Sequence, residues 1–86
     1  MPVPKVTHRH DYVEYAYFNE YDLLHRLDGP AVTIDRGISF VSYWYVNGYY
    51  VDTEIREWAE EMNIDLENLT EEDKILIAMA WSDYQE

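Results

Sequence analysis

The sequence has no cysteine, few glycine and proline residues (3 of each) and only 6 basic residues against 18 acidic ones. Without cysteine, the chain can form no disulfide framework, no thiolate nucleophile and no cysteine-based zinc site. No apolar run approaches the roughly 20 residues that cross a bilayer, and residues 1–5 lack the apolar core of a signal peptide. We therefore expect a cytoplasmic protein that does not bind membranes.

The scarcity of basic residues leaves a formal net charge of −12 on 86 residues. Nucleic acids and anionic lipids are bound by basic surfaces, so direct binding to either is not expected. Hydrophobic residues nevertheless make up 48% of the chain and aromatic residues 16%, which is typical of a folded protein rather than a disordered one. A chain of this length predicts a single domain, residues 1–86.

The acidic residues are concentrated in the C-terminal part of the chain. Residues 1–51 carry 6 acidic and 4 basic residues, and residues 52–86 carry 12 and 2, so the net charges are −2 and −10. The composition changes at the same boundary, from tyrosine, valine and phenylalanine to glutamate, isoleucine, leucine and alanine. This predicts a β-hairpin region over residues 1–51 and an acidic helical region over residues 52–86.

Three stretches rich in β-branched and aromatic residues predict strands, over residues 12–19, 31–35 and 38–46. Asn47 and Gly48 predict a type I′ turn, because both central positions of that turn require positive φ. Residues 49–51 would then form the returning strand of a hairpin.

Two helices are predicted after this hairpin. The first is capped by Asp52 or Thr53 and places four apolar residues on one side, namely Ile55, Trp58, Ala59 and Met62. The second begins with the capping-box sequence Thr70 to Asp73 and runs to about Ser82. The predicted fold class is α+β, with a small antiparallel sheet of repeated hairpins followed by two C-terminal helices packed on one sheet face.

The pattern Val-x-Tyr-x-Tyr-x-Asn-x-Tyr occurs twice, over residues 13–21 and 41–49. The stretch LHRLDGPAV over residues 24–32, followed by WYVNG over residues 44–48, resembles the MORN-like repeats of small bacteriophage proteins. The resemblance covers about residues 15–51 and implies a phage origin, a core of β-hairpins and a role in scaffolding or protein contact. The sequence departs from the repeat at Glu20, which replaces a turn glycine, and after Gly48, where an acidic helix replaces the next copy.

Signals for catalysis are weak. His8, His10 and Asp11 offer a metal two imidazoles and a carboxylate, but a closed site needs three or four well-placed ligands, and a solvated N-terminal segment is the alternative. The sequence has no phosphate-binding glycine-rich loop, calcium loop or Ser-His-Asp order. We therefore expect no enzymatic activity, no cofactor and no metal.

Two kinds of residue are candidates for binding a partner protein. The acidic candidates lie on the predicted helices, at Glu57, Glu60, Glu61, Glu71, Glu72 and Asp73. The aromatic candidates lie in the second repeat copy, at Tyr43, Trp44, Tyr45 and Tyr49, where packing within the sheet is the alternative role. Solubility is the alternative explanation of the acidity.

These features favour a small acidic phage-type protein that inhibits a host protein with a basic surface. A nucleic-acid-handling or antiviral defence factor is the expected partner, and the acidic surface would imitate DNA. A DNA duplex as long as a twelve-residue helix carries about ten charges, a density that two acidic helices can approach together but one cannot reach alone. The alternative function is a self-associating structural module, a homodimer formed through Ile77, Trp81 and Tyr84 or through the edge of its sheet.

Overall fold

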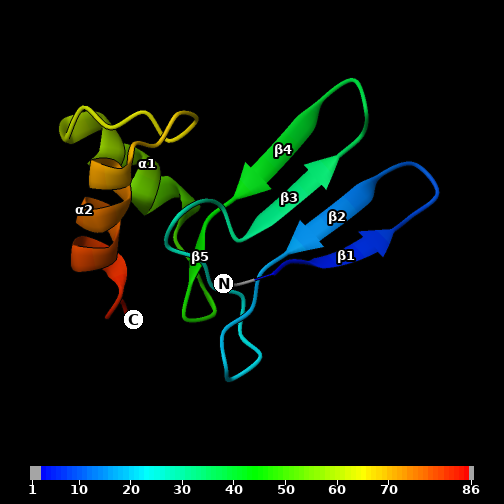
Figure 1. Ribbon diagram of the computed structural model, residues 1–86, viewed down its shortest axis with the longest axis horizontal. Helices are drawn as coiled ribbons and strands as arrows, with labels where there is room; N and C mark the ends of the chain where they lie inside the picture. Colours follow the sequence, from blue (N-terminus) through cyan, green and yellow to red (C-terminus); the bar gives the residue numbers. More distant parts are fainter. Residues whose placement is uncertain (1–2, 86) are drawn as a thin grey trace.

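The computed structural model describes residues 3–85, and its first part is a four-stranded antiparallel sheet (Figure 1). β-Branched and aromatic residues make up at least half of each strand, as sheets prefer. The strands lie in sequence order, so each pairs with the next through a hairpin connection. Their bounds are β1 Lys5–His8, β2 Val13–Ala16, β3 Val32–Asp35 and β4 Phe40–Tyr43.

A second, two-stranded sheet follows directly, with β5 at Tyr45–Val46 and β6 at Tyr49–Tyr50. The predicted turn is confirmed, since Asn47 and Gly48 have φ angles of 52° and 86°. The predicted strand over residues 38–46 is interrupted at Trp44, because the N–H of Trp44 donates to Asp52 Oδ1 instead of to a neighbouring strand.

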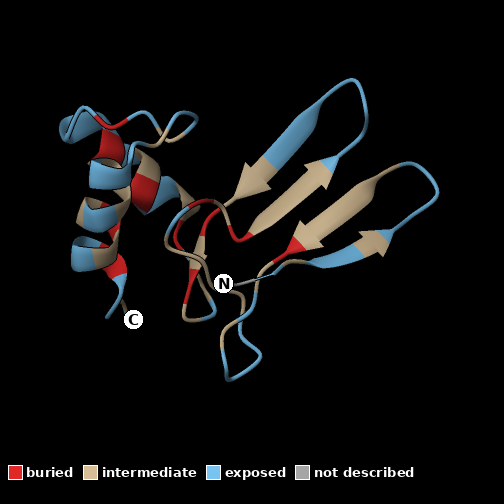
Figure 2. Cartoon of the chain, in the orientation of Figure 1, coloured by how far each residue is buried: buried red, intermediate tan, exposed pale blue. Residues whose placement is uncertain are grey.

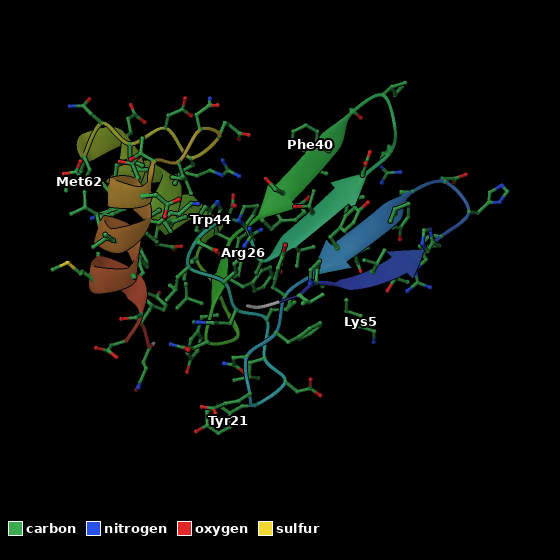
Figure 3. The ribbon with its side chains drawn as sticks, in the orientation of Figure 1. Lys5, Tyr21, Arg26, Phe40, Trp44 and Met62 are labelled. Carbon is green, nitrogen blue, oxygen red and sulfur yellow. The ribbon has the colours of Figure 1, made fainter. Side chains whose placement is uncertain are left out.

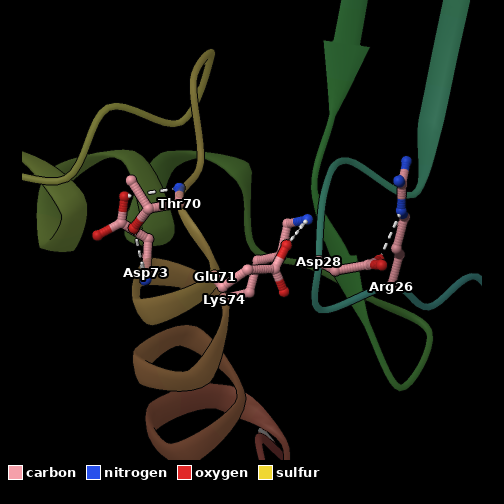
Figure 4. Close-up of polar contacts among 6 residues, drawn as sticks. All are labelled: Arg26, Asp28, Thr70, Glu71, Asp73 and Lys74. Atoms are coloured by element: carbon pink, nitrogen blue, oxygen red, sulfur yellow. Dashed lines mark hydrogen bonds and ion pairs between the residues drawn. The ribbon is translucent and has the colours of Figure 1, made fainter.

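Two helices complete the fold, α1 at Asp52–Glu61 and α2 at Glu71–Trp81. The predicted capping box starts α2, with Asp73 N donating to Thr70 Oγ1 and Thr70 N donating to Asp73 Oδ2, both at 3.1 Å (Figure 4). Each bond satisfies an N–H that the first turn of a helix leaves without an intrahelical acceptor. Asn63, just after α1, has a φ of 58°, a conformation that asparagine tolerates at helix ends.

The main core lies between the helices and the small hairpin. Figure 2 shows buried residues gathered there, whereas most of the four-stranded sheet is intermediate or exposed. The core side chains come from both parts of the chain: Trp44, Val46, Val51, Ile55, Ile77 and Trp81. The predicted α+β class is confirmed, and the sheet face that the helices cover belongs to the β5–β6 hairpin (Figure 1).

One polar cluster joins the edge of the four-stranded sheet to α1. Asp52 accepts the N–H of Trp44 on Oδ1 (3.0 Å) and Nε of Arg56 on Oδ2 (2.8 Å). Arg56 in turn donates through Nη2 to the carbonyl oxygen of Ser42 on β4, at 3.2 Å. The hydrogen bond that Arg56 donates to Asp52 is the main cause that raises the pKa of Arg56 above its ordinary value. The cluster therefore fixes where α1 begins relative to β4.

Strand β1 is not among the predicted strands. Its sequence, KVTH, has a single apolar residue, and it lies at the edge of the sheet, where backbone pairing with β2 holds it. The predicted strand over residues 12–19 is also shorter than expected. After Ala16 the chain leaves the sheet and turns back, with Phe18 bridging to Leu24.

Candidate functional site

The helical unit, residues 52–85, lies at one end of the molecule, with the four-stranded sheet at the other (Figure 1). Both of its basic residues are already ion-paired within it, Arg56 with Asp52 at 2.8 Å and Lys74 with Glu71 at 3.1 Å. Among the described residues 3–85, the other nine carboxylates of this unit form no ion pair: Glu54, Glu57, Glu60, Glu61, Asp65, Glu67, Glu72, Asp73 and Asp83. The helical unit therefore carries a strong negative charge that no neighbouring base compensates.

The predicted acidic residues differ in how freely they face solvent. Glu57, Glu60 and Glu61 are exposed and line an open hollow of about 430 Å³ at the C-terminal half of α1. At the start of α2, Glu72 is exposed, and Glu71 is exposed but bonded to Lys74 (Figure 4). Asp73 is half-buried, and its carboxylate is used by the capping box described above. Glu57, Glu60, Glu61 and Glu72 are thus the freest of the six.

The aromatic candidates separate into surface and core residues. Tyr43 and Tyr45 are half-buried, and their ring centroids lie 6.3 Å and 5.3 Å from that of Tyr50, which is 48% exposed. Desolvation and then the nearby Asp52 carboxylate raise the pKa of Tyr50 above its ordinary value. We call Tyr43, Tyr45 and Tyr50 the tyrosine cluster. It lies where the four-stranded sheet meets the small hairpin.

Trp44 and Tyr49 face the core instead. Trp44 is 1% exposed and lies under the hairpin, between the sheet and the helices (Figure 3), so its indole cannot serve as a surface anchor as predicted. Tyr49 packs edge-on against Tyr84 at 5.9 Å between ring centroids. Tyr50 was missed by the sequence reasoning, although a two-residue turn at Asn47 places it directly opposite Tyr45.

The residues predicted to form a dimer are used inside the chain. Ile77 is fully buried, Trp81 packs against Trp58 at 6.0 Å between centroids, and Tyr84 stacks on Trp81 at 5.4 Å. This side of α2 faces the core because the small hairpin needs an apolar cover. The prediction of self-association through these side chains is therefore wrong. The opposite side of α2 is exposed, with Met79 at 78%.

The repeat-like stretch over residues 24–32 organises the centre of the molecule. The guanidinium of Arg26 lies over the ring of Tyr17 at 4.1 Å, and donates to Asp28 Oδ1 at 2.8 Å (Figure 4) and to the Pro30 carbonyl at 3.3 Å. Burial raises the pKa of Asp28, but the hydrogen bond and charge of Arg26 outweigh it and leave that pKa lowered. A β-carbon on Gly29 would lie 2.6 Å from Arg26 Cζ, so glycine is required for this contact.

The same stretch binds the second hairpin through its backbone. The N–H of Gly48 donates to the carbonyl of Leu24 at 2.8 Å, and the N–H of Arg26 donates to the carbonyl of Tyr45 at 3.3 Å. The N–H of Asn47 donates to Nδ1 of His25 at 3.0 Å, and burial lowers the pKa of His25 below its ordinary value. His25 is therefore a neutral acceptor in the folded protein.

Neither comparison with known proteins nor the other described residues indicate a further site. Protein-family models, curated proteins and solved structures gave no match to the chain. Among residues 3–85, no three histidine, aspartate or glutamate side chains converge as metal ligands would. None of the helices within that range is long and apolar enough to cross a membrane.

Proposed function

We propose that this chain is a small, non-enzymatic protein of bacteriophage type that binds a host protein and inhibits it. The observation that carries the proposal is the uncompensated negative charge of the helical unit, whose two bases are both held by its own carboxylates. Such a surface attracts a basic partner from a distance and orients it on approach. A protein that handles nucleic acid, including an antiviral defence factor, has a basic surface of the required sign.

The charge density supports a DNA-like surface built from both helices. α1 is 10 residues long and carries five acidic residues and one arginine. A DNA duplex of the same length, about 15 Å, carries about nine charges. α1 alone falls short of that density, and α2 packs beside it through the contact between Trp58 and Trp81 and adds the acidic residues of its first turn.

The tyrosine cluster supplies the apolar part of the proposed interface. Tyrosine is enriched among the residues that dominate protein–protein binding energy, because a ring and a hydroxyl together bury area and donate a hydrogen bond. The cluster lies close to Asp52 and Arg56 at the start of α1, since both charges act on Tyr50. A partner that binds α1 would therefore reach the exposed ring of Tyr50.

The test compares two variants that remove equal charge from opposite ends of the molecule. Glu57→Gln/Glu61→Gln removes two carboxylates from α1, and Asp11→Asn/Asp35→Asn removes two exposed carboxylates from the four-stranded sheet and its turns. Each is used with the wild type to capture partners from a bacterial lysate at 50 and 150 mM salt. The captured nucleic-acid-binding protein is then purified, and its binding to DNA is measured with and without each variant.

We expect the wild type and the Asp11/Asp35 variant to capture and inhibit the same basic protein, and the Glu57/Glu61 variant to lose both effects. Binding should also weaken as salt rises, as it does for exposed charges. Equal behaviour of the two variants, or no basic partner even at low salt, would contradict the proposal.

A second candidate is a self-associating structural module, and one observation favours it. Within residues 3–85 neither face of the four-stranded sheet carries a helix, and Phe40 and Val41 on the edge strand β4 remain 63% and 46% exposed. A sheet normally buries at least one face. Sedimentation equilibrium of the wild type and of Phe40→Ser would detect a dimer formed through the sheet face that carries Phe40. A monomer at 100 μM would argue against it.

A further inference from the structure

A groove of about 390 Å³ forms where three segments meet that lie far apart in the sequence. The turn at Asn19 to Leu23 forms one wall, the turn at Asn47 and Tyr49 the floor, and the end of α2 at Ser82 to Gln85 the other wall. Asn47 fixes this arrangement, because its Nδ2 donates to the carbonyls of both Ser82 and Tyr84 at 3.1 Å.

The groove carries negative charge from one carboxylate, Asp83, and from the end of a helix. α2 ends there, and the C-terminus of a helix carries a partial negative charge. The last turn of α2 contains no basic residue, and Asp83, which follows it, is exposed and has no ion pair among the described residues. The residues that line the groove include no lysine and no arginine.

The groove also contains two tyrosines, one from each turn. Tyr21 is 74% exposed and stands at the tip of its turn (Figure 3), and Tyr49 lies on the floor. A tyrosine ring beside a carboxylate suits a guanidinium, which stacks on the ring and donates in its own plane to the carboxylate. The molecule already contains this arrangement, where Arg26 lies over Tyr17 and donates to Asp28.

We propose that this groove binds the side chain of an arginine presented by a partner protein, with Tyr21 and Asp83 as its main contacts. The inference goes beyond the proposed function, because it concerns a surface separate from α1 and specifies the chemical group that is bound. The acidic charge of α1 would attract a basic partner, and the groove would select an exposed arginine on it.

The test is an NMR titration of the ¹⁵N-labelled full chain with Nα-acetyl-arginine amide at constant ionic strength. Nα-acetyl-citrulline amide, which has the same shape without the charge, is the control ligand. We expect the arginine ligand to shift the side-chain amide of Asn47 and the amide signals of Gln85 more than those of residues 57–61. The citrulline ligand should leave them in place.

Two groove variants and two controls decide the result. Asp83→Asn and Tyr21→Ala should each weaken binding about two- to fivefold, which is the range for one exposed ion pair or cation–π contact. Both positions are exposed, so the signals outside the groove should report an intact fold. Glu54→Gln, an exposed carboxylate of α1, should leave the affinity unchanged.

The Glu57→Gln/Glu61→Gln variant separates this inference from the proposed function. It should lose the basic partner but keep the arginine titration at wild-type affinity. The inference is overturned if citrulline shifts the groove signals equally, if the largest shifts fall on residues 57–61, or if neither groove variant weakens binding.

Discussion

Replacing Asp52 should test how the helical unit is attached to the sheet. One oxygen of this carboxylate accepts the N–H of Trp44, which is buried, and the other accepts Nε of Arg56. Asp52→Ala removes both acceptors. Asp52→Asn keeps an oxygen for the N–H of Trp44 and removes only the charge. The pair of variants therefore separates the backbone hydrogen bond from the ion pair.

The expected losses follow from burial. A buried N–H left without an acceptor costs about 1–3 kcal/mol. The ion pair contributes at most about 1 kcal/mol because the side chain of Arg56 is 40% exposed, and a first-turn carboxylate adds about 0.3–1 kcal/mol. We therefore expect Asp52→Ala to lower the free energy of unfolding by about 2–4 kcal/mol and Asp52→Asn by about 1 kcal/mol.

Urea unfolding followed by tryptophan fluorescence and by circular dichroism would measure both variants. The matched control is Glu54→Ala, which removes another first-turn carboxylate of α1 that makes no side-chain hydrogen bond, and should cost less than about 1 kcal/mol. For a domain of this size, the alanine variant should also melt at least about 8 °C lower. Equal losses for Asp52→Ala and Asp52→Asn would refute the reasoning, since the N–H of Trp44 would then not need this acceptor.

Three further predictions concern the centre of the molecule and its core. His25 has a folded pKa below its ordinary value of 6.5, so the unfolded chain takes up the proton first as the pH falls. Its contribution to stability is therefore complete above about pH 6.5 and is lost below it. The wild type should lose stability between pH 7 and 5 relative to His25→Asn, which keeps an acceptor but does not titrate. A stability difference between the two proteins that is independent of pH would contradict this prediction. Gly29→Ala should cost about 1–2 kcal/mol by displacing the guanidinium of Arg26, and almost nothing in an Arg26→Ala background, as a double-mutant cycle would measure. Ile77→Ala should cost about 2–5 kcal/mol and Met79→Ala less than about 1 kcal/mol in urea unfolding; comparable losses would mean that α2 presents a different side to the core.

The features that the sequence predicts well depend on contacts between near neighbours. The turn at Asn47 and Gly48 and the capping box at Thr70 each involve residues at most a few positions apart. The start of α1 coincides with the change in composition at Asp52, because acidic residues favour the first turn of a helix. The local sequence therefore determines these elements, whatever residues surround them in the fold.

The features that the sequence does not predict depend on contacts between residues that lie far apart in the chain. β1 has one apolar side chain and is held by backbone pairing with β2, so the alternation of apolar and polar residues does not reveal this strand. α2 is apolar on two sides, and its packing on the core formed by Trp44 and its neighbours buries Ile77 rather than Met79. The same dependence on distant partners applies to the candidate site. Five of the six acidic candidates are exposed, whereas Asp73 is half-buried at the capping box and Trp44 is buried in the core.

The position of the core also bears on whether the acidity serves binding or only solubility. Because the helices use their apolar sides to cover the small hairpin, Glu57, Glu60 and Glu61 of α1 face solvent, and mobile counterions or a partner neutralise them. A basic partner that replaces those counterions releases them, so its affinity must fall steeply with salt. A surface that is acidic only for solubility has no such dependence, and removing two of its charges changes no affinity. The slope of binding against salt, compared between the wild type and the Glu57→Gln/Glu61→Gln variant, therefore distinguishes the two explanations directly.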